Sequence, residues 1–420
     1  MRSRLNTFYT ICFIYAFLDI YTFFGLKSLL KNKKQQVLFS VAYWLLSAFI
    51  YYCFYKFHEA FIGGRFFSST DANLYLGVIL TALATKLTFV AFLLPQDIGR
   101  FFYGIGNFLY TFFSGKDFPD EHKTFPSRRR FLTLAATGIA ALPFSTMFYG
   151  ITKGKYAYTV NKVKLAFADL PAAFDGFKIV QISDIHAGSL DNISSVAKGV
   201  QMINEQAADI VVFTGDLVNS DKDEVNDYID VFKKIQAKSG KFSILGNHDY
   251  YGVPDGVQEQ KAYWADFYKK YEQMGFELLN NKNAILEKEG ERICLLGVEN
   301  WGRARYFPKK GDLDKALNNT TSNDFCVLLS HDPTHWDDKV IPHQKHIHLT
   351  LSGHTHGFQF GINMPGFKWS PAQYRYDKWM GLYEEAKQYL YVNRGFGFLT
   401  FPGRIGMWPE ITVIELEREV

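Results

Sequence analysis

The chain has 420 residues, which is too long for one average domain and enough for a membrane region plus one sizeable soluble domain. Its formal net charge of +4 is modest, so the composition argues against a nucleic-acid-binding protein. Its four cysteines form no framework of the kind that staples small secreted domains, although a disulfide between Cys294 and Cys326 is open if the domain is exported.

Four apolar segments before residue 150 are long enough to cross a membrane. They are Thr7–Leu26, Gln36–Tyr55, Ala72–Leu94 and the shorter Phe131–Tyr149. A helix of about 20 residues crosses a hydrocarbon core of ~30 Å. Ile98–Phe113 is rich in aromatic residues but interrupted by glycines, and we expect an interfacial or re-entrant segment there.

Basic residues in short loops set the expected orientation, because such loops stay in the cytoplasm. The loop after the first span holds Lys27, Lys31, Lys33 and Lys34, and the segment before the fourth span holds Lys116, Lys123, Arg128, Arg129 and Arg130. The loop between the second and third spans, with Lys56 and Arg65, is less basic. The soluble domain is therefore expected on the outer side of a bacterial inner membrane, although Arg2 and Arg4 count against this orientation.

The segment Ser127–Leu132, with three consecutive arginines, also resembles a twin-arginine export signal. The alternative is an ordinary basic stop before a helix. Both interpretations put the soluble domain on the same side of the membrane.

Two ionisable residues lie deep within the predicted spans. Asp19 and Lys86 are at about equal depth, ~18 and ~21 Å along parallel spans at ~1.5 Å per residue. A buried ion pair would lessen the cost of burying either group. Separate snorkelling of the two side chains, or an ion or proton pathway, are the alternatives.

After residue 176, apolar runs alternate with helical patterns, which is typical of a layered α/β fold. The predicted strands are Phe177–Ile182, Asp209–Thr214, Phe242–Leu245, Ile293–Gly297, Phe325–Ser330, His346–Ser352, Tyr389–Asn393 and Glu410–Leu416, and the predicted helices are Val196–Gln206, Asp223–Lys238 and Glu259–Met274. Five of these strands end at Asp, Asn or His residues. The carboxyl ends of strands are where α/β folds place their sites.

The residues at those strand ends occur in one order: Asp184-Ile185-His186, Gly215-Asp216, Gly246-Asn247-His248-Asp249, His331 and Gly353-His354-Thr355-His356. Asp, Asn and His hold hard or borderline divalent cations through oxygen and imidazole nitrogen. This order resembles the signature of the calcineurin-like metallophosphoesterases, and the resemblance covers roughly residues 178–420.

The resemblance implies a four-layer α/β/β/α sandwich over residues 177–420, preceded by an all-α transmembrane region (1–150) and a linker with a first strand (151–176). It also implies roles for single residues. One metal would be held by Asp184, His186 and His356, and the other by Asn247, His331 and His354, with Asp216 as the bridge. His248 would be the catalytic acid or phosphate donor, oriented by Asp249.

Two divalent ions are expected as cofactors. Oxygen and nitrogen ligation without thiolate favours Mn, with Fe, Zn, Co or Ni as alternatives. The expected reaction is hydrolysis of a phosphoester, phosphodiester or pyrophosphate by a metal-bridging hydroxide.

The expected substrate is phospholipid-like or lipid-linked, and the expected partners include the bilayer but no nucleic acid. The alternatives are a UDP-2,3-diacylglucosamine-type pyrophosphate hydrolase of lipid A synthesis and, in another class, a non-catalytic scaffold or a regulator of a membrane transporter. The resemblance does not predict the oligomeric state.

Two sets of residues outside the motifs are further candidates. An apolar lip that meets lipid is one interpretation of Phe396, Phe398, Leu399, Phe401, Met407 and Trp408, and packing in the core is the other. Candidate substrate-binding residues are Arg394, Arg404, Arg303 and Trp301.

Overall fold

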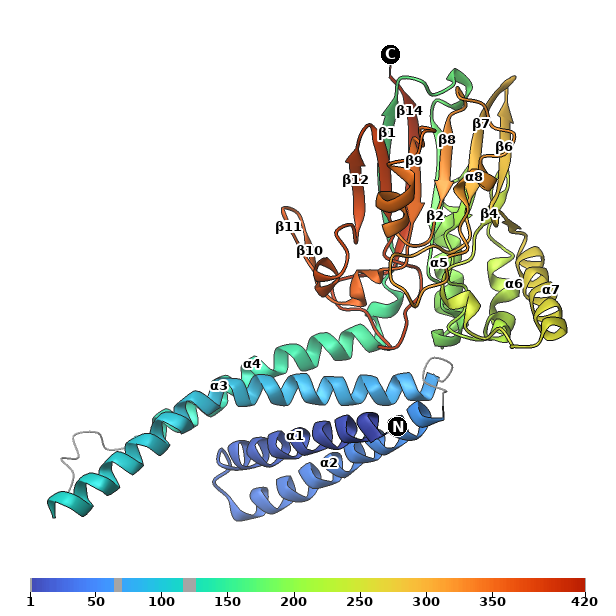
Figure 1. Cartoon of the computed structure of the whole chain (residues 1–420). Coiled ribbons are helices and arrows are strands. Elements are labelled where there is room, and N and C mark those ends of the chain that lie inside the picture. Colours follow the sequence, from blue (N-terminus) through green and yellow to red (C-terminus); the bar gives the residue numbers. More distant parts are fainter. Residues whose placement is uncertain (1, 64–69, 116–125, 420) are drawn as a thin grey trace. The chain divides into compact units, whose positions relative to one another are not determined.

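The computed structural model describes residues 2–63, 70–115 and 126–419, and the chain divides into two compact units (Figure 1). The first unit holds residues 1–64 and 74–149, and the second holds residues 65–73 and 150–420. Several residues used to predict the orientation lie outside the described residues, either entirely (Arg65, Lys116, Lys123) or by their side chains (Arg2, Arg4, Arg128).

The first unit contains the four predicted spans. They are α1 (Arg2–Lys27), α2 (Lys33–Ile62), α3 (Thr70–Ser114) and α4 (Pro126–Thr152), and all four are long and apolar enough to cross a membrane. An interfacial or re-entrant segment was predicted at residues 98–113, but α3 continues through Pro95 as one 45-residue helix. The re-entrant alternative is therefore wrong, and the interfacial alternative stays a prediction. Glycine lowers helix stability by only about 1 kcal/mol per residue, so the glycines of this segment do not break the helix.

The predicted Asp19–Lys86 ion pair is confirmed. Lys86 Nζ contacts Asp19 Oδ1, and the Asp19 carboxylate also accepts hydrogen bonds from Ser47 and from the Tyr43 hydroxyl, at 2.7 Å for Tyr43. Lys86 Nζ donates a further bond of 2.6 Å to the Tyr15 hydroxyl. The pair thus joins α1, α2 and α3 through a polar network.

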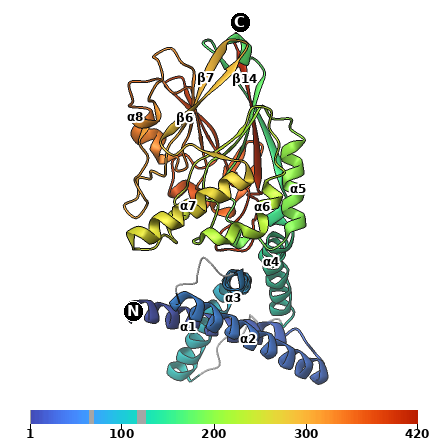
Figure 2. The same ribbon diagram turned by 90° about the vertical axis from the view of Figure 1, so that its right-hand side faces the viewer.

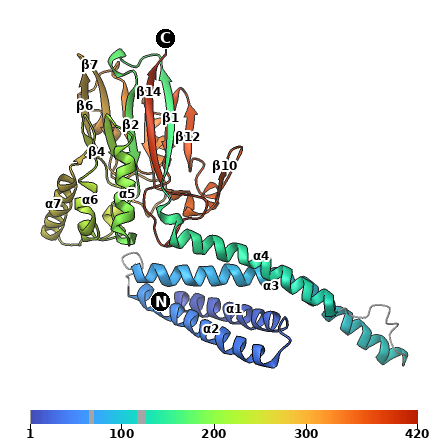
Figure 3. The same ribbon diagram turned by 180° about the vertical axis from the view of Figure 1, so that it is seen from behind.

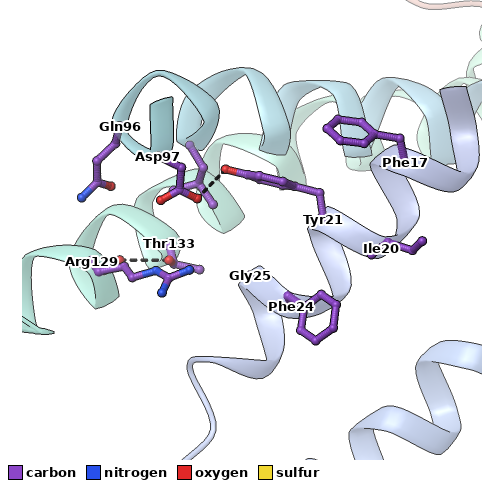
Figure 4. A pocket seen from close by; sticks show the side chains of 10 residues that line it. Phe17, Ile20, Tyr21, Phe24, Gly25, Gln96, Asp97, Arg129 and Thr133 are labelled. Carbon is purple, nitrogen blue, oxygen red and sulfur yellow. Dashed lines mark hydrogen bonds between the residues drawn. The ribbon is translucent and has the colours of Figure 1, made fainter. Parts of the chain in front are cut away.

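A cavity of about 230 Å³ lies among α1, α3 and α4 (Figure 4). Phe17, Phe24 and Leu93 supply apolar lining. Asp97 of α3 accepts a 2.8 Å hydrogen bond from the hydroxyl of Tyr21 in α1, and this bond joins the two helices (Figure 4). The cavity is therefore apolar along part of its wall and polar where this bond lies.

The second unit is built on two six-stranded sheets (Figures 1 and 3). The first has the order β1 (Thr159–Phe167), β14 (Glu410–Arg418), β2 (Phe177–Ile182), β3 (Ile210–Phe213), β4 (Lys241–Ser243) and β5 (Glu277–Leu278). The second has the order β12 (Gly381–Glu385), β13 (Gln388–Val392), β9 (Leu349–Ser352), β8 (Cys326–Leu329), β7 (Glu291–Gly297) and β6 (Lys282–Lys288). A separate hairpin pairs β10 (Ile362–Met364) with β11 (Phe367–Trp369).

Buried side chains fill three successive interfaces, which confirms the four-layer sandwich. One core lies between the two sheets, with Ile179 and Val212 from the first and Leu295 and Leu351 from the second. A second core lies between the first sheet and α5 (Ile193–Asn204), α6 (Ile229–Phe232) and α7 (Val257–Met274), and these helices cover one face of the sheet in Figure 2. A third lies between the second sheet, α8 (Leu313–Ala316) and the helical turn η6 (Trp336–Val340).

One predicted helix has a different backbone. Asp223–Lys238 was expected to be helical throughout, but it folds as the 3-10 segment η4 (Lys222–Tyr228) followed by the short α6. Its apolar residues Val225 and Phe232 are fully buried against the first sheet as the periodicity indicated. The pattern therefore identified the buried face correctly and the helix type wrongly.

Candidate metal centre

The predicted ligands come together at the carboxyl ends of five strands. Asp184 and His186 follow β2, Asp216 follows β3, and Asn247 follows β4, all in the first sheet. His331 follows β8, and His354 and His356 follow β9, in the second sheet. Two groups can each hold a metal ion, with their ligand atoms within 4.8 Å of one another: Asp184 with His186 and His356, and Asp216 with His331 and His354.

Five of these residues have a backbone conformation that side-chain-bearing residues rarely adopt. The φ angles are +52° at Asp184, +49° at His186, +60° at Asp216, +73° at His354 and +52° at His356. Such conformations cost free energy and persist where the surrounding structure imposes them. Here they supply the twist that turns both Asp184 and His186, two residues apart on an extended segment, toward the same point.

The first group is closely packed. His186 Nε2 lies 3.0 Å from His356 Nε2, and His356 Nε2 lies 3.3 Å from Asp184 Oδ1. The Asp184 carboxylate is held by the backbone N–H of His354, which donates to both of its oxygens at 3.0 Å. Ring nitrogens and a carboxylate oxygen therefore converge in a buried space.

The second group shares its carboxylate with the first. Asp216 Oδ2 lies 3.1 Å from His331 Nε2 and 3.6 Å from His186 Nε2, so Asp216 stands between the two groups as a bridging ligand would. His354 Nδ1 lies 3.3 Å from His331 Nε2. The other ring nitrogen of His331 bonds the Thr214 carbonyl at 2.7 Å, which turns Nε2 toward the centre.

Asn247 supplies an observation that fits a bound cation. Its side-chain oxygen is buried and makes no hydrogen bond with the described residues, while its amide nitrogen donates to the Tyr251 hydroxyl at 3.2 Å. A buried acceptor without a partner costs about 1–3 kcal/mol. Together with the two carboxylates and four imidazoles, this oxygen fits two divalent ions.

The charges of the two groups support the same assignment. Burial lowers the pKa of His186 and of His354, which keeps these rings neutral as metal ligands require. Burial opposes ionisation of Asp216, but His331 and His248 outweigh it and hold the pKa of Asp216 well below its usual range. Burial likewise lowers the pKa of His331, but the nearby Asp216 carboxylate prevails and raises it to about 10. Unlike His186 and His354, His331 is therefore protonated at neutral pH without a cation, and it would have to release this proton when it binds one. Asp216 therefore remains ionised at the centre.

His248 lies beside these groups, with its ring 4.9 Å from that of His186. Its Nδ1 bonds the carbonyl of Asn219 at 2.7 Å, which directs Nε2 to the opposite side of the ring. That Asp249 orients His248 stays a prediction, and the contacts of its carboxylate are of another kind. The Asp249 carboxylate accepts hydrogen bonds from the backbone N–H groups of Asp216, Leu217, Val218 and Gly246, so it ties the β3 loop to the β4 loop.

Four residues that hold these side chains in place were missed in the sequence. They are Asn219, Tyr376, Asp332 and Tyr251. The Tyr376 hydroxyl bonds His354 Nε2 at 2.9 Å, and Asp332 Oδ2 lies 3.5 Å from His354 Nε2. Asp332 directly follows His331, and Tyr251 follows Asn247 by four residues. Their proximity to a motif is a signal that could have identified them. Tyr376 lies 22 residues from His354 and carries no such signal.

The substrate-binding roles predicted for Arg394 and Arg404 stay predictions, although both side chains are buried. Arg394 is 2% exposed and pairs with Glu410, with 2.5 Å between Nε and Oε2. Arg404 is fully buried, donates to the carbonyls of Arg394, Gly397 and Met407, and lies with Nη2 3.1 Å from His356 Nδ1. Buried guanidinium groups need partners for their N–H groups, and these partners come from the protein itself.

The other substrate candidates make contacts of a different kind. Arg303 is half exposed and forms a two-point ion pair with Asp338, at 2.7 and 3.0 Å. The Trp301 ring packs against His335, with ring centroids 5.5 Å apart. A substrate role for Arg303 and Trp301 stays a prediction.

The apolar stretch after residue 395 is largely core. Phe396, Phe398 and Met407 are at most 1% exposed, and both phenylalanines belong to the core that faces α5 to α7. Of the two interpretations of this stretch, core packing is the correct one for these residues.

The chain matches two family models. The model described as "Probable Calcineurin-like phosphoesterase, transmembrane domain" matches residues 3–155, and the model described as "Calcineurin-like phosphoesterase" matches residues 177–358. The two matches correspond to the spans and to most of the sandwich.

Several curated proteins are similar to this chain. An uncharacterized metallophosphoesterase of Bacillus subtilis, YkuE, is 31% identical over 251 residues, which cover 59% of this chain and 82% of that protein. A transmembrane protein with metallophosphoesterase domain from Danio rerio is 30% identical over 298 residues, which cover 69% of this chain and 63% of that protein. The match thus spans less than two thirds of the fish protein. The chain belongs to the calcineurin-like metallophosphoesterases and carries a transmembrane domain of four helices ahead of the phosphoesterase domain.

Proposed function

We propose that this chain is a membrane-anchored phosphohydrolase with two divalent metal ions, manganese first among them. The observation that carries the proposal is the pair of converging ligand groups with Asp216 between them, at 3.1 Å from His331 and 3.6 Å from His186. The buried, unpartnered oxygen of Asn247 supports it.

The proposed ligands form two sets that share Asp216. Asp184, His186 and His356 would hold one ion, Asn247, His331 and His354 the other, and Asp216 would contact both. When bound, such a pair of ions supplies Lewis acidity at the phosphoryl oxygens and makes a nucleophile available from water at neutral pH. The buried walls around the seven ligands exclude bulk water, which strengthens each electrostatic interaction.

His248 would donate a proton or hydrogen bond to the phosphate. Its Nδ1 is engaged by the Asn219 carbonyl at 2.7 Å, so Nε2 is the nitrogen directed elsewhere. Burial lowers the pKa of His248, and an approaching phosphate anion favours the protonated ring. The ring would therefore take up its proton together with the substrate and deliver it to the leaving oxygen.

A phospholipid-like or lipid-linked phosphate is the substrate class that we propose. The support is the domain's attachment to four apolar helices, which keeps it at a bilayer. A non-catalytic scaffold is disfavoured, because every ligand position of the family pattern is filled and the structure brings the ligands together.

The test is hydrolysis of bis(p-nitrophenyl) phosphate by the purified full chain loaded with Mn. Asp216→Asn should lower kcat/KM by at least about 100-fold. Even substitutions of residues that only orient metal ligands lower metal affinity or activity by about 10–100-fold. Asp227→Asn, at an exposed aspartate of η4, is the matched control and should keep full activity. Undiminished activity in Asp216→Asn would contradict the two-metal proposal. A UDP-linked pyrophosphate assayed in parallel tests the lipid A alternative.

A further inference from the structure

The β10–β11 hairpin leaves the domain directly after the metal-binding segment. Its strands pair Ile362 with Trp369 and Met364 with Phe367. Pro365 and Gly366 form the turn, and Gly366 has a φ of +79°, which suits glycine. The hairpin stands apart from both six-stranded sheets (Figure 1).

The two faces of this hairpin differ in polarity. Side chains alternate along a strand, so the paired positions 362/369 and 364/367 share one face, and Asn363 and Lys368 share the other. The first face is entirely apolar, yet Ile362 is 40%, Met364 55% and Phe367 52% exposed. Phe360, 45% exposed and packed edge-on against Trp369, extends it. Such a contiguous apolar surface marks a contact with a partner.

Backbone hydrogen bonds connect the base of this hairpin to the end of α4. The candidate span of α4 ends at Thr152. The Gly150 carbonyl accepts from the Arg404 N–H at 3.3 Å. The next residue, Ile405, donates to the Gln359 carbonyl at 2.7 Å and accepts from the Gly361 N–H at 2.9 Å. All of these contacts lie within the second unit, so a single loop, residues 404–405, links the hairpin base to the last turn of α4.

The same loop reaches the metal centre. Arg404, which bonds Gly150 through its backbone, lies with Nη2 3.1 Å from His356 Nδ1. His356 and Ile362 are six residues apart along the chain. The Ser370 hydroxyl, just after β11, donates to the Gly357 carbonyl at 2.7 Å and fixes both ends of this segment together. Span end, hairpin base and metal ligand therefore share one hydrogen-bonded unit.

We propose that the β10–β11 hairpin is a membrane-contacting element that lays its apolar face into the leaflet at which α4 ends. The bilayer is the occupant that fits, because the hairpin base is joined through Ile405 and Arg404 to the last turn of α4, a candidate span, and the exposed face carries no charge. An element of this kind sits in the boundary between head groups and acyl chains. Resting on the proposed function, the hairpin would bring lipid-linked phosphates within reach of the metal centre.

The contact is tested with single cysteines in the full chain, labelled with an environment-sensitive dye in nanodiscs of phosphatidylethanolamine and phosphatidylglycerol. Phe367→Cys lies on the apolar face, Asn363→Cys on the polar face, and Ser322→Cys on an exposed loop elsewhere in the domain. Nitroxide-labelled lipid should quench the dye at 367 at least about twofold more than at 363 or 322. Equal quenching at 367 and 322 would overturn the proposal, and crosslinking of 367 to a second copy would replace lipid by a dimer contact.

A second measurement separates this proposal from the proposed function. The double variant Met364→Asp/Phe367→Asp should slow hydrolysis of p-nitrophenyl hexadecyl phosphate embedded in the same nanodiscs by about tenfold, because half-buried apolar side chains lose their partner. Its activity on soluble bis(p-nitrophenyl) phosphate should stay within about twofold of the parent chain. Equal rates of the parent chain and the double variant on the embedded substrate would overturn the membrane contact but not the proposed function. Loss of both activities in Asp216→Asn, while the hairpin variant keeps its activity on the soluble substrate, would support the metal centre independently of the membrane contact.

Discussion

Arg404 is a buried cation that contacts His356, a proposed metal ligand, on the side of the ring away from the centre. Burial, together with the neighbouring Arg394 charge, lowers the pKa of Arg404 to about 9. Its fork of N–H groups is shared among three backbone carbonyls and the ring of His356. A lysine offers one point charge in place of a planar fork. Arg404 is thus a positioning residue.

Arg404→Lys should therefore loosen His356. We expect metal affinity to fall by about 10–100-fold, as for other residues that orient ligands. The measurement is bound metal per chain after dialysis, together with KM and kcat on the soluble diester. Arg303→Lys, at an exposed arginine, is the control and should keep its metal. Full metal occupancy in Arg404→Lys would show that the contact with His356 has no positioning role.

Glu224 gives a pH dependence with a definite sign. It accepts a 2.5 Å hydrogen bond from the N–H of Asn219, the residue whose carbonyl holds His248. Burial raises the pKa of Glu224 from 4.5 to about 7. The folded chain thus binds this proton more tightly than the unfolded chain, so the contribution to stability is full below pH 4.5 and is lost as the pH rises to 7.

The variant Glu224→Gln should not lose stability in this way as the pH rises, because glutamine does not ionise. The variant should unfold at a higher denaturant concentration than the parent at pH 8, by about 2 kcal/mol in the free energy of unfolding, and match it near pH 4.5. Glu287→Gln, at an exposed glutamate on β6, should leave the pH profile unchanged. The measurement is denaturant unfolding of the full chain in detergent from pH 4.5 to 8. Parallel pH profiles for parent and Glu224→Gln would contradict the assignment.

At the scale of elements, the Asp19–Lys86 contact fastens α1 to α3. Removing one partner leaves a buried charge unpaired, which costs about 3–5 kcal/mol, whereas removing both leaves none. Asp19→Asn and Lys86→Met should each lower the melting temperature in detergent, and the double variant should be no less stable than the worse single variant. A double variant whose loss equals the sum of the two single losses would show that the pair does not couple the helices.

The sequence predicted some elements well for a physical reason. β3 lies within the predicted strand Asp209–Thr214, because a strand covered on both faces reads as a continuous apolar run, here Ile210–Phe213. The short β10 and β11 carry apolar residues that face outward, so no burial pattern marked them. The 3-10 backbone of η4 was likewise not predictable from the apolar pattern, because 3.0 and 3.6 residues per turn give similar spacings of apolar residues within a single turn.

That the proposed metal ligands lie close together was predictable for a similar reason, because their motifs fall at strand ends. The residues behind them were not. Asp249 and His248 are neighbours in the sequence, yet the carboxylate of Asp249 meets backbone N–H groups of another loop and the ring of His248 meets Asn219. Likewise, nothing in the composition around Arg394 and Arg404 distinguishes a buried arginine from one that faces substrate. Such pairings depend on how loops from two sheets pack, which local pattern does not encode.

At the scale of the whole molecule, we expect the phosphoesterase domain on the outer side of the membrane. Lys27, Lys31, Lys33 and Lys34 around the α1–α2 connection support this orientation. Ser322→Cys, on an exposed loop of the domain, should react with an impermeant maleimide in intact cells, and Ser28→Cys, next to those lysines, only after lysis. The opposite labelling pattern would invert the topology.

The position of β14 has a consequence for the order in which the first sheet can assemble. β14 lies between β1 and β2, so β1 can join the rest of the sheet only after β14 (Glu410–Arg418) has been made. The strand that follows the spans in the sequence is therefore joined to the sheet last, whereas β2, β3 and β4, which end near Asp184, Asp216 and Asn247, can pair before it.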